Sequence, residues 1–443
     1  MKREREVYNT NRYFIVLALM LVSLINKTTL TVSMVVMCLY YCVYESSDGA
    51  VKALVLLTIR SIFSTGVGVS IGSISTLKWI LLMGLSAYVF IGKGSRSPSF
   101  ALFLRAIIPY AMLIAVMSLL NSCYPLVSIF KLFAWAFVFS AVVYGVYDSK
   151  RIDWIGFLLL CLGTVLVVSL GTLPLSLGFL RNGRGFQGIT NHPNLYGLIC
   201  AISFTVGMTY EWKSRNGKPL FLSLCGVEAF MTRSRTSVFT IVIVIVYYLF
   251  SADYPLTEKI IAAFLMALVL GMVFAIIYIN DPNHEGSIWQ FIFKGHDENL
   301  LYSRTEQFGT QTDRFADSPI IGNGFMTPWK EGVRSWSFSF DLQIEPGNLV
   351  LSVLGQTGLV GMVAFLAVFI YLYSFTPKHL RIVYLTPFIM CMGEMVFFST
   401  NNIAVLLYVL FGVCFQPQNR VKKKGGSNEK ATLYRQYTVP VSR

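Results

Sequence analysis

The sequence predicts an all-α polytopic membrane protein with about 14 transmembrane helices and one large external loop. Apolar residues make up 55% of the 443 residues and charged residues only 13%, whereas about a quarter of a soluble domain is charged. Mean hydropathy is +0.62. The eight cysteines are scattered and lie mostly in apolar runs, which excludes a disulfide scaffold. The bilayer therefore takes the place of a soluble hydrophobic core.

A helix needs about 20 apolar residues to cross the hydrocarbon layer. The pair 218–233 and 235–250 is also compatible with a re-entrant pair, so the expected number of spans is roughly 12–14. Both interpretations leave residues 232–236 on the outer side. In chain order the expected spans are 13–26, 29–45, 51–67, 76–92, 100–120, 126–146, 152–174, 194–211, 218–233, 235–250, 257–279, 347–373, 382–399 and 402–417.

Basic residues indicate the orientation, because short loops rich in Lys and Arg remain in the cytoplasm. This bias explains most of the net charge of +14, so we expect no nucleic acid partner. Residues 1–279 are expected to hold about eleven helices and an outer loop at 175–193, and 280–346 a large outer loop. Residues 347–417 then hold the last helices, and 418–443 form a disordered basic cytoplasmic tail. The basic residues that mark alternate loops are Lys93, Arg96, Lys150, Arg151, Lys213, Arg215, Lys218, Lys378 and Arg381.

The first outer loop carries Arg181 and Arg184 between glycines, against the positive-inside trend. Glycines allow backbone N–H groups to approach a ligand closely. Asn191 is expected to cap the following helix, with Pro193 in its first turn. The N-terminus of that helix would point its partial positive charge at an anion held by the arginines. The alternative is a Gly-rich turn with incidental charge; we favour the anion site.

A second outer segment, Thr232-Arg233-Ser234-Arg235-Thr236, adds two further arginines at the ends of apolar helices. The alternative is that these side chains extend to the lipid interface without a ligand. Together the two segments present four outward guanidinium groups, each able to bind phosphate oxygens in a bidentate manner. A lipid carrier in the outer leaflet has its pyrophosphate at this depth.

The large loop is acidic, with ten Asp/Glu and five Lys/Arg between 280 and 346, so its arginines require a separate reason. Arg304 and Arg314 precede Pro319-Ile320-Ile321-Gly322-Asn323-Gly324, a tight turn that requires glycine. Glu345, beside Asn348 where the loop re-enters the membrane, is a candidate general base. The alternative for Glu345 is an acid that offsets the dipole of the next helix.

Four ionisable residues within spans fall in the outer half under this topology: Arg60, Lys131, Glu228 and Glu394. Charge inside a membrane is costly and usually lines a cavity or pairs with another charge. These residues favour a cavity that opens outward. The four histidines are too dispersed for a metal site, and we expect no metal and no cofactor.

The order of these segments resembles the O-antigen polymerase/ligase family over about residues 180–361. The matching pieces are Gly188 to Asn194, Ser234-Arg235-Thr236, Pro319 to Gly324 and Glu345 to Gly361. The resemblance implies a GT-C-like, metal-independent glycosyltransferase in the bacterial inner membrane, with its active site facing the periplasm. It implies undecaprenyl-pyrophosphate-linked glycans as donor and acceptor, membrane lipid as surroundings, and a chain-length regulator protein as a further partner.

Ligases of this family tend to carry His before the Asn, where this chain has Glu-Pro-Gly-Asn. The chain is therefore expected to polymerise repeat units, with an O-antigen ligase as the alternative and a lipid-linked oligosaccharide flippase as the alternative from another class. The expected base is Glu345, with His192 in reserve, and the other expected substrate contacts are Asn194, Asn348 and Arg304. The residues expected to bind pyrophosphate are Arg181, Arg184, Arg233, Arg235 and Arg314.

Overall fold

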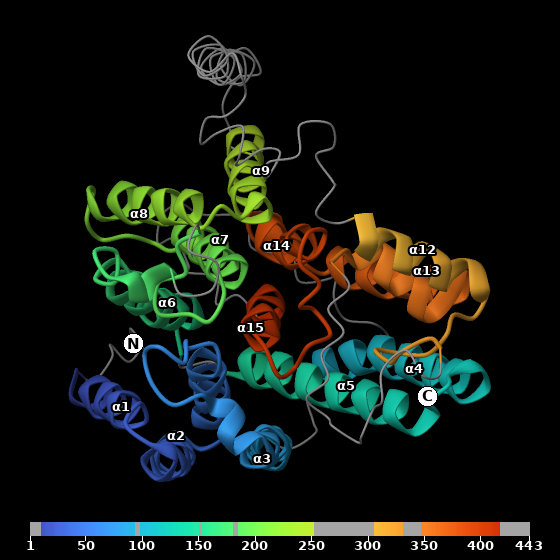
Figure 1. Cartoon of the computed structure of the whole chain (residues 1–443), viewed down its shortest axis with the longest axis horizontal. Coiled ribbons are helices and arrows are strands. Elements are labelled where there is room, and N and C mark those ends of the chain that lie inside the picture. Colours follow the sequence, from blue (N-terminus) through green and yellow to red (C-terminus); the bar gives the residue numbers. More distant parts are fainter. Residues whose placement is uncertain are drawn as a thin grey trace, which may run out of the picture.

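The computed structural model describes residues 10–93, 98–149, 152–179, 185–251, 305–330 and 347–416. Within these residues the chain is helical (Figure 1), and the β-structure there is a single antiparallel bridge between Phe63 and Thr190. The all-α prediction is confirmed for this part of the chain. The expected span 257–279 and the expected tail 418–443 lie outside the described residues.

The N-terminal helices lie where apolar spans were expected. Helix α2 contains a break at Ser46, whose φ of 52° is not helical. The break divides α2 into two helices, which correspond to the expected spans 29–45 and 51–67, although the second already ends at Ser61. The bounds are α1 (Thr10–Val22), α2 (Lys27–Ser61), α3 (Ser75–Lys93), α4 (Pro98–Asn121), α5 (Pro125–Asp148) and α6 (Trp154–Leu170).

The C-terminal helices follow the same pattern, with one short amphipathic helix, α12, in the large loop. Five of the described helices are long and apolar enough to cross a membrane: α2, α3, α4, α5 and α13. Five shorter apolar helices accompany them: α1, α6, α7, α9 and α15. The bounds are α7 (Pro193–Thr209), α8 (Gly217–Met231), α9 (Arg235–Ser251), α12 (Thr305–Asp317), α13 (Leu349–Ser374), α14 (Arg381–Cys391) and α15 (Ala404–Phe415).

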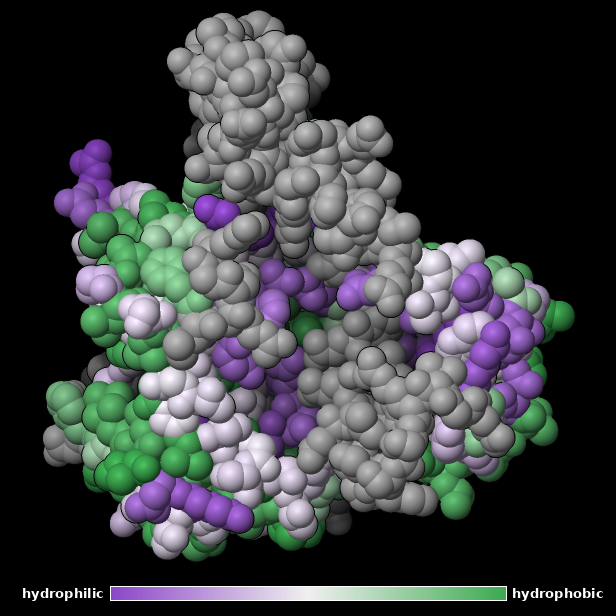
Figure 2. All heavy atoms as spheres, in the orientation of Figure 1, coloured by the Kyte–Doolittle hydropathy of each residue, from purple (hydrophilic) through white to green (hydrophobic). Residues whose placement is uncertain are grey.

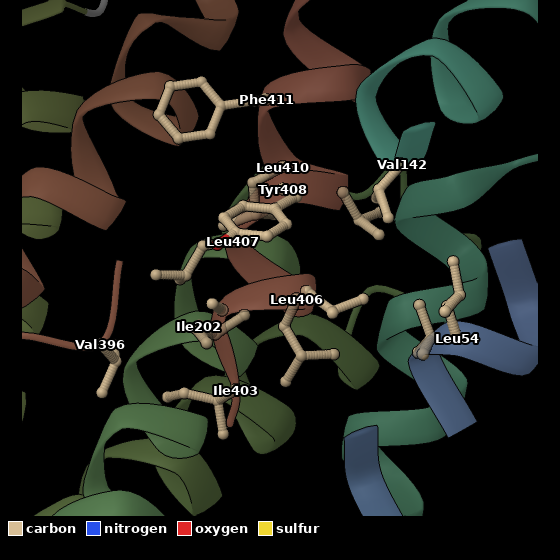
Figure 3. Close-up of a cluster of buried hydrophobic side chains, with 14 of the residues drawn as sticks. Leu54, Val142, Ile202, Val396, Ile403, Leu406, Leu407, Tyr408, Leu410 and Phe411 are labelled. Carbon is tan, nitrogen blue, oxygen red and sulfur yellow. The ribbon is translucent and has the colours of Figure 1, made fainter. Parts of the chain in front are cut away.

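Helix α15 is the centre of the packed interior. It is apolar on all sides, which is typical of a helix buried all round, and its residues from Ala404 to Phe411 are fully buried. Side chains from α2, α5 and α7 meet it (Figure 3), represented by Leu54, Val142 and Ile202. The peripheral helices instead expose apolar side chains such as Ile91 and Val363, as expected for surfaces that face lipid.

The expected span 382–399 is shorter than predicted, because α14 ends at Cys391 and residues 392–403 are not helical. Most of this segment is buried, including Phe397, whose side chain is inaccessible. Irregular backbone at membrane depth is tolerated only where protein surrounds it or where it lines a cavity. Residues 395–400 therefore lie within the protein, whereas Met392 at the start of the segment is exposed.

Helix α13 is broken at Gly358, where φ is 62°. The break frees the N–H groups of Leu359 and Val360, which donate to the carbonyl oxygens of Pro319 and Ile320 at 2.8 and 3.1 Å. The Pro-x-x-Gly-x-Gly turn is thereby held against α13. Gly322 and Gly324 have φ of 70° and 101°, which confirms that this turn requires glycine.

Candidate functional site

The first part of the site is the arginine turn, residues 232–234 between α8 and α9. Arg233 has a φ of 57°, a left-handed conformation that costs a non-glycine residue about 1–2 kcal/mol. The turn is held by the Thr232 hydroxyl, which donates to the Ala229 carbonyl at 2.7 Å and accepts from Ser234 N at 3.0 Å. Strained backbone of this kind is concentrated at functional sites. Arg233 is half-buried, and Arg235 begins α9 beside it.

The second part is the start of α7. His192, and not the expected Asn191, is the residue that caps this helix, and Pro193 occupies its first turn. His192 Nδ1 accepts a hydrogen bond from the backbone N–H of Asn194 at 3.1 Å. A backbone amide can only donate, so Nδ1 carries no proton and the proton of the neutral ring is on Nε2. The nitrogen of His192 that could take a proton is therefore occupied by the cap, which weakens its candidacy as the reserve base.

The loop before α7 packs on the arginine turn. Phe186 N donates to the Met231 carbonyl at 3.0 Å, and Gly185 lies so close to the Thr232 carbonyl that a Cβ there would be 2.7 Å from it. The two segments whose arginines are expected to form one anion site are thus in contact. Arg181 and Arg184 themselves lie outside the described residues.

The third part is residues 392–394, directly after α14. Asn194 Nδ2 donates to Glu394 Oε1 at 2.7 Å. Asn348, the N-cap of α13, accepts from Leu351 N at 3.1 Å and donates through Nδ2 to the Met392 carbonyl at 2.9 Å. The starts of α7 and α13, which lie 200 and 44 residues earlier in the chain, are therefore both hydrogen-bonded to residues 392–394.

We call residues 392–394, with the helix ends that contact them, the junction. Gly393 adds a third contact to it, because it lies against Thr236 in the first turn of α9, and a Cβ on Gly393 would collide with that side chain. Three helices, α7, α9 and α13, consequently begin around residues 392–394. Figure 1 shows α7 and α14 near the middle of the molecule, and Figure 2 shows hydrophilic residues gathered in the middle of the same face. Each helix N-terminus carries roughly half a positive charge. Arg233 and Arg235 lie at the neighbouring end of α9, whereas Glu394 and the C-terminal end of α14 bring negative charge to the same junction.

Arg314 lies apart from this junction. It is only 1% exposed, and its Nη2 donates to the Gly324 carbonyl at 2.6 Å. Burial lowers the pKa of Arg314 to about 9, still above neutral pH, so the guanidinium keeps its charge. Lys131 donates to the Met326 carbonyl nearby at 2.7 Å. Both cations thus hold the loop 318–326 through hydrogen bonds to its carbonyl oxygens. A pyrophosphate contact by Arg314 stays a prediction. Arg304 and Glu345 lie outside the described residues.

Two other charged residues expected in the outer half, Arg60 and Glu228, have environments separate from the junction. Arg60 donates to the carbonyl oxygens of Ser23 and Val69 at 2.9 and 2.6 Å. Glu228 is fully buried near Tyr196, and neither carboxylate oxygen has a hydrogen-bond partner of good geometry within the described residues. Of the four ionisable residues expected in the outer half, Glu394 reaches the junction. The sequence signalled it only as an acid inside an apolar segment.

Residues 220–366 match the family model described as O-antigen ligase. The match spans α8, the arginine turn, α9, the 318–326 loop and more than half of α13, including Asn348. The match confirms the predicted resemblance to the O-antigen polymerase/ligase family over this stretch, which is about a third of the chain. The chain matches no curated protein.

Proposed function

We propose that this protein polymerises lipid-pyrophosphate-linked oligosaccharide repeat units at the periplasmic face of the bacterial inner membrane. In this proposal the chain crosses the membrane about 14 times, as the apolar segments predict. The observation that carries the proposal is the junction at residues 392–394. There three helix N-termini come together next to the arginine turn, and in this proposal they hold the pyrophosphate of a lipid in the outer leaflet.

The reaction needs charge stabilisation more than covalent chemistry. A hydroxyl of one lipid-linked repeat unit attacks the anomeric carbon of the growing chain, and undecaprenyl pyrophosphate leaves with the bonding electron pair. Arg233 and Arg235 neutralise the developing negative charge, with Arg181 and Arg184 assigned to the same task from the sequence. Glu345 is the base expected from the sequence, and Asn348 fixes the helix that follows it.

A specific observation favours a second candidate function, because the matching family model is described as a ligase. A ligase would move the finished glycan to the lipid A core. The Glu-Pro-Gly-Asn sequence at 345–348 favours the polymerase, since ligases of this family tend to carry His before the Asn. A flippase, the other class, does not require an arginine turn at one end of its helices.

The test is a gel ladder of surface polysaccharide from a strain that lacks this protein. Loss of a polymerase leaves glycan with one repeat, whereas loss of a ligase or a flippase leaves no surface glycan. Complementation with Arg235→Ala or Arg184→Ala should abolish long chains, and Arg235→Lys should restore a small part, because an ammonium keeps the charge but loses the bidentate contact. Normal ladders from both Ala variants, at normal protein levels, would contradict the assigned role of the arginines. A chain-length regulator partner would appear as a narrow distribution of lengths.

A further inference from the structure

We propose that Glu394 is a catalytic base, which takes the proton of the acceptor hydroxyl while Asn194 orients its carboxylate. This inference rests on the proposed glycosyl transfer. Glu394 Oε1 accepts from Asn194 Nδ2 at 2.7 Å, and its side chain is neither buried nor fully exposed. The bond to Asn194 fixes the direction of the carboxylate, whose two oxygens together offer about four acceptor positions.

The backbone around Glu394 is held from three directions. Glu394 N donates to the Met390 carbonyl at 3.1 Å, which continues the last turn of α14. Asn348 binds the Met392 carbonyl from the start of α13, and Gly393 is packed against Thr236. A base fixed in this way loses little freedom on reaching the transition state, which is the main requirement for efficient proton transfer from a bound hydroxyl.

The charge of Glu394 also requires an explanation. A site that only bound pyrophosphate would be weakened by a carboxylate among its cations, because like charges repel. A site that also deprotonates a sugar hydroxyl needs one carboxylate near the phosphate, where the anomeric carbon lies. Among the described residues Glu394 is an acid at the junction, whereas Glu228 is buried inside the helices.

The step balances without a co-reactant. The acceptor O–H bond breaks and its proton goes to Glu394, while the new bond forms between that oxygen and the anomeric carbon. The bond from the anomeric carbon to the phosphate oxygen breaks, and its electron pair leaves with undecaprenyl pyrophosphate. Glu394 then releases the proton to water. Its role is separate from that of the arginines, which contact the leaving group.

The experiment uses the purified protein in proteoliposomes, with repeat-unit lipid extracted from the deletion strain as substrate. Glu394→Gln retains an oxygen that accepts from Asn194, so it preserves the hydrogen bond and removes the base. We expect the turnover rate to fall by about 10²–10⁴-fold, with substrate affinity retained. Glu394→Asp should keep more activity than Glu394→Gln. Asn194→Ala should lower turnover by a smaller factor, about 10-fold.

The matched control is Glu211→Gln, an exposed glutamate between α7 and α8 at the opposite end of these helices, which should behave as wild type. Wild-type turnover in Glu394→Gln, or more activity in Glu394→Gln than in Glu394→Asp, would overturn the inference and leave Glu345 as the base. Failure of the wild-type protein to extend the lipid-linked glycan would instead overturn the proposed function. The two failures are thus distinguishable in one set of measurements.

Discussion

Arg233→Gly separates the contribution of the arginine turn to function from its contribution to folding. Arg233 follows the C-cap of α8 in a left-handed conformation, the position at which helices usually place glycine. Glycine relieves a strain of about 1–2 kcal/mol. It also adds about 0.5–1 kcal/mol of unfolded-chain entropy. The net change in the free energy of unfolding is therefore close to zero or slightly stabilising.

The expected functional change is larger. Hydrogen bonds from a guanidinium to a charged phosphate contribute about 1.5–3 kcal/mol, which corresponds to a fall in turnover of roughly 10–100-fold at 1.36 kcal/mol per tenfold change. The assay pairs the proteoliposome turnover rate with the thermal midpoint in detergent. Arg215→Gly is the matched control, because Arg215 is exposed in the turn at the opposite end of α7 and α8, and it should leave turnover unchanged.

Two results would refute this reasoning. Wild-type turnover in Arg233→Gly would show that the guanidinium contacts no substrate group. A clear fall in the thermal midpoint would show that Arg233 holds the turn in place, so that its strain has no functional origin. Arg233→Lys provides an intermediate case, since it keeps the charge and the strained backbone but loses the bidentate contact.

Two further predictions test the topology and the large loop. Cys introduced at Gln307, which is exposed on α12, should react with an impermeant thiol reagent added to cells whose outer membrane is permeabilised. Cys introduced at Ser427 should not react, because the tail is expected in the cytoplasm. Labelling at Ser427 alone would show that the orientation is reversed. Gly358→Ala and Gly322→Ala should each destabilise the protein by about 1–3 kcal/mol, because alanine is strained at a positive φ. The new methyl groups would also collide with the carbonyl oxygens of Ile320 and Gln356, respectively. A protease should then cut the 318–326 loop more rapidly. Gly226→Ala, which meets nothing within 4 Å, is the control, and equal protease resistance in all three variants would show that the loop does not depend on the α13 break.

The helices could be predicted from the sequence because crossing a bilayer is a local requirement, met or failed by each window of about 20 residues. The same holds for the Pro-x-x-Gly-x-Gly turn, where the need for glycine is a property of a few consecutive residues. The irregular segment after α14 was not predictable. Residues 392–399 are mostly apolar, and the contacts that hold them come from distant residues, such as Asn348, Thr236 and Tyr408.

The candidate site also has some features that local sequence predicts and others that depend on tertiary packing. The arginine turn and the start of α7 were found because charge and glycine at the ends of apolar segments are visible in the sequence. The cap was assigned one residue too early, because Asn191 and His192 both carry an acceptor and only backbone geometry chooses between them. The burial of Arg314 depends on how the large loop packs on α13, which no local pattern encodes.

The sequence by itself determined the class of protein, the position of most helices, and the candidate residues of the site. These follow from hydropathy and charge, which are properties of the residues themselves. Only the tertiary structure decided which of these residues meet. The bond between Asn194 and Glu394 joins positions 200 residues apart, and it forms because α7, α9 and α13 begin around the same three residues. That convergence is set by helix packing, whose long-range contacts leave no signal in any short stretch of sequence.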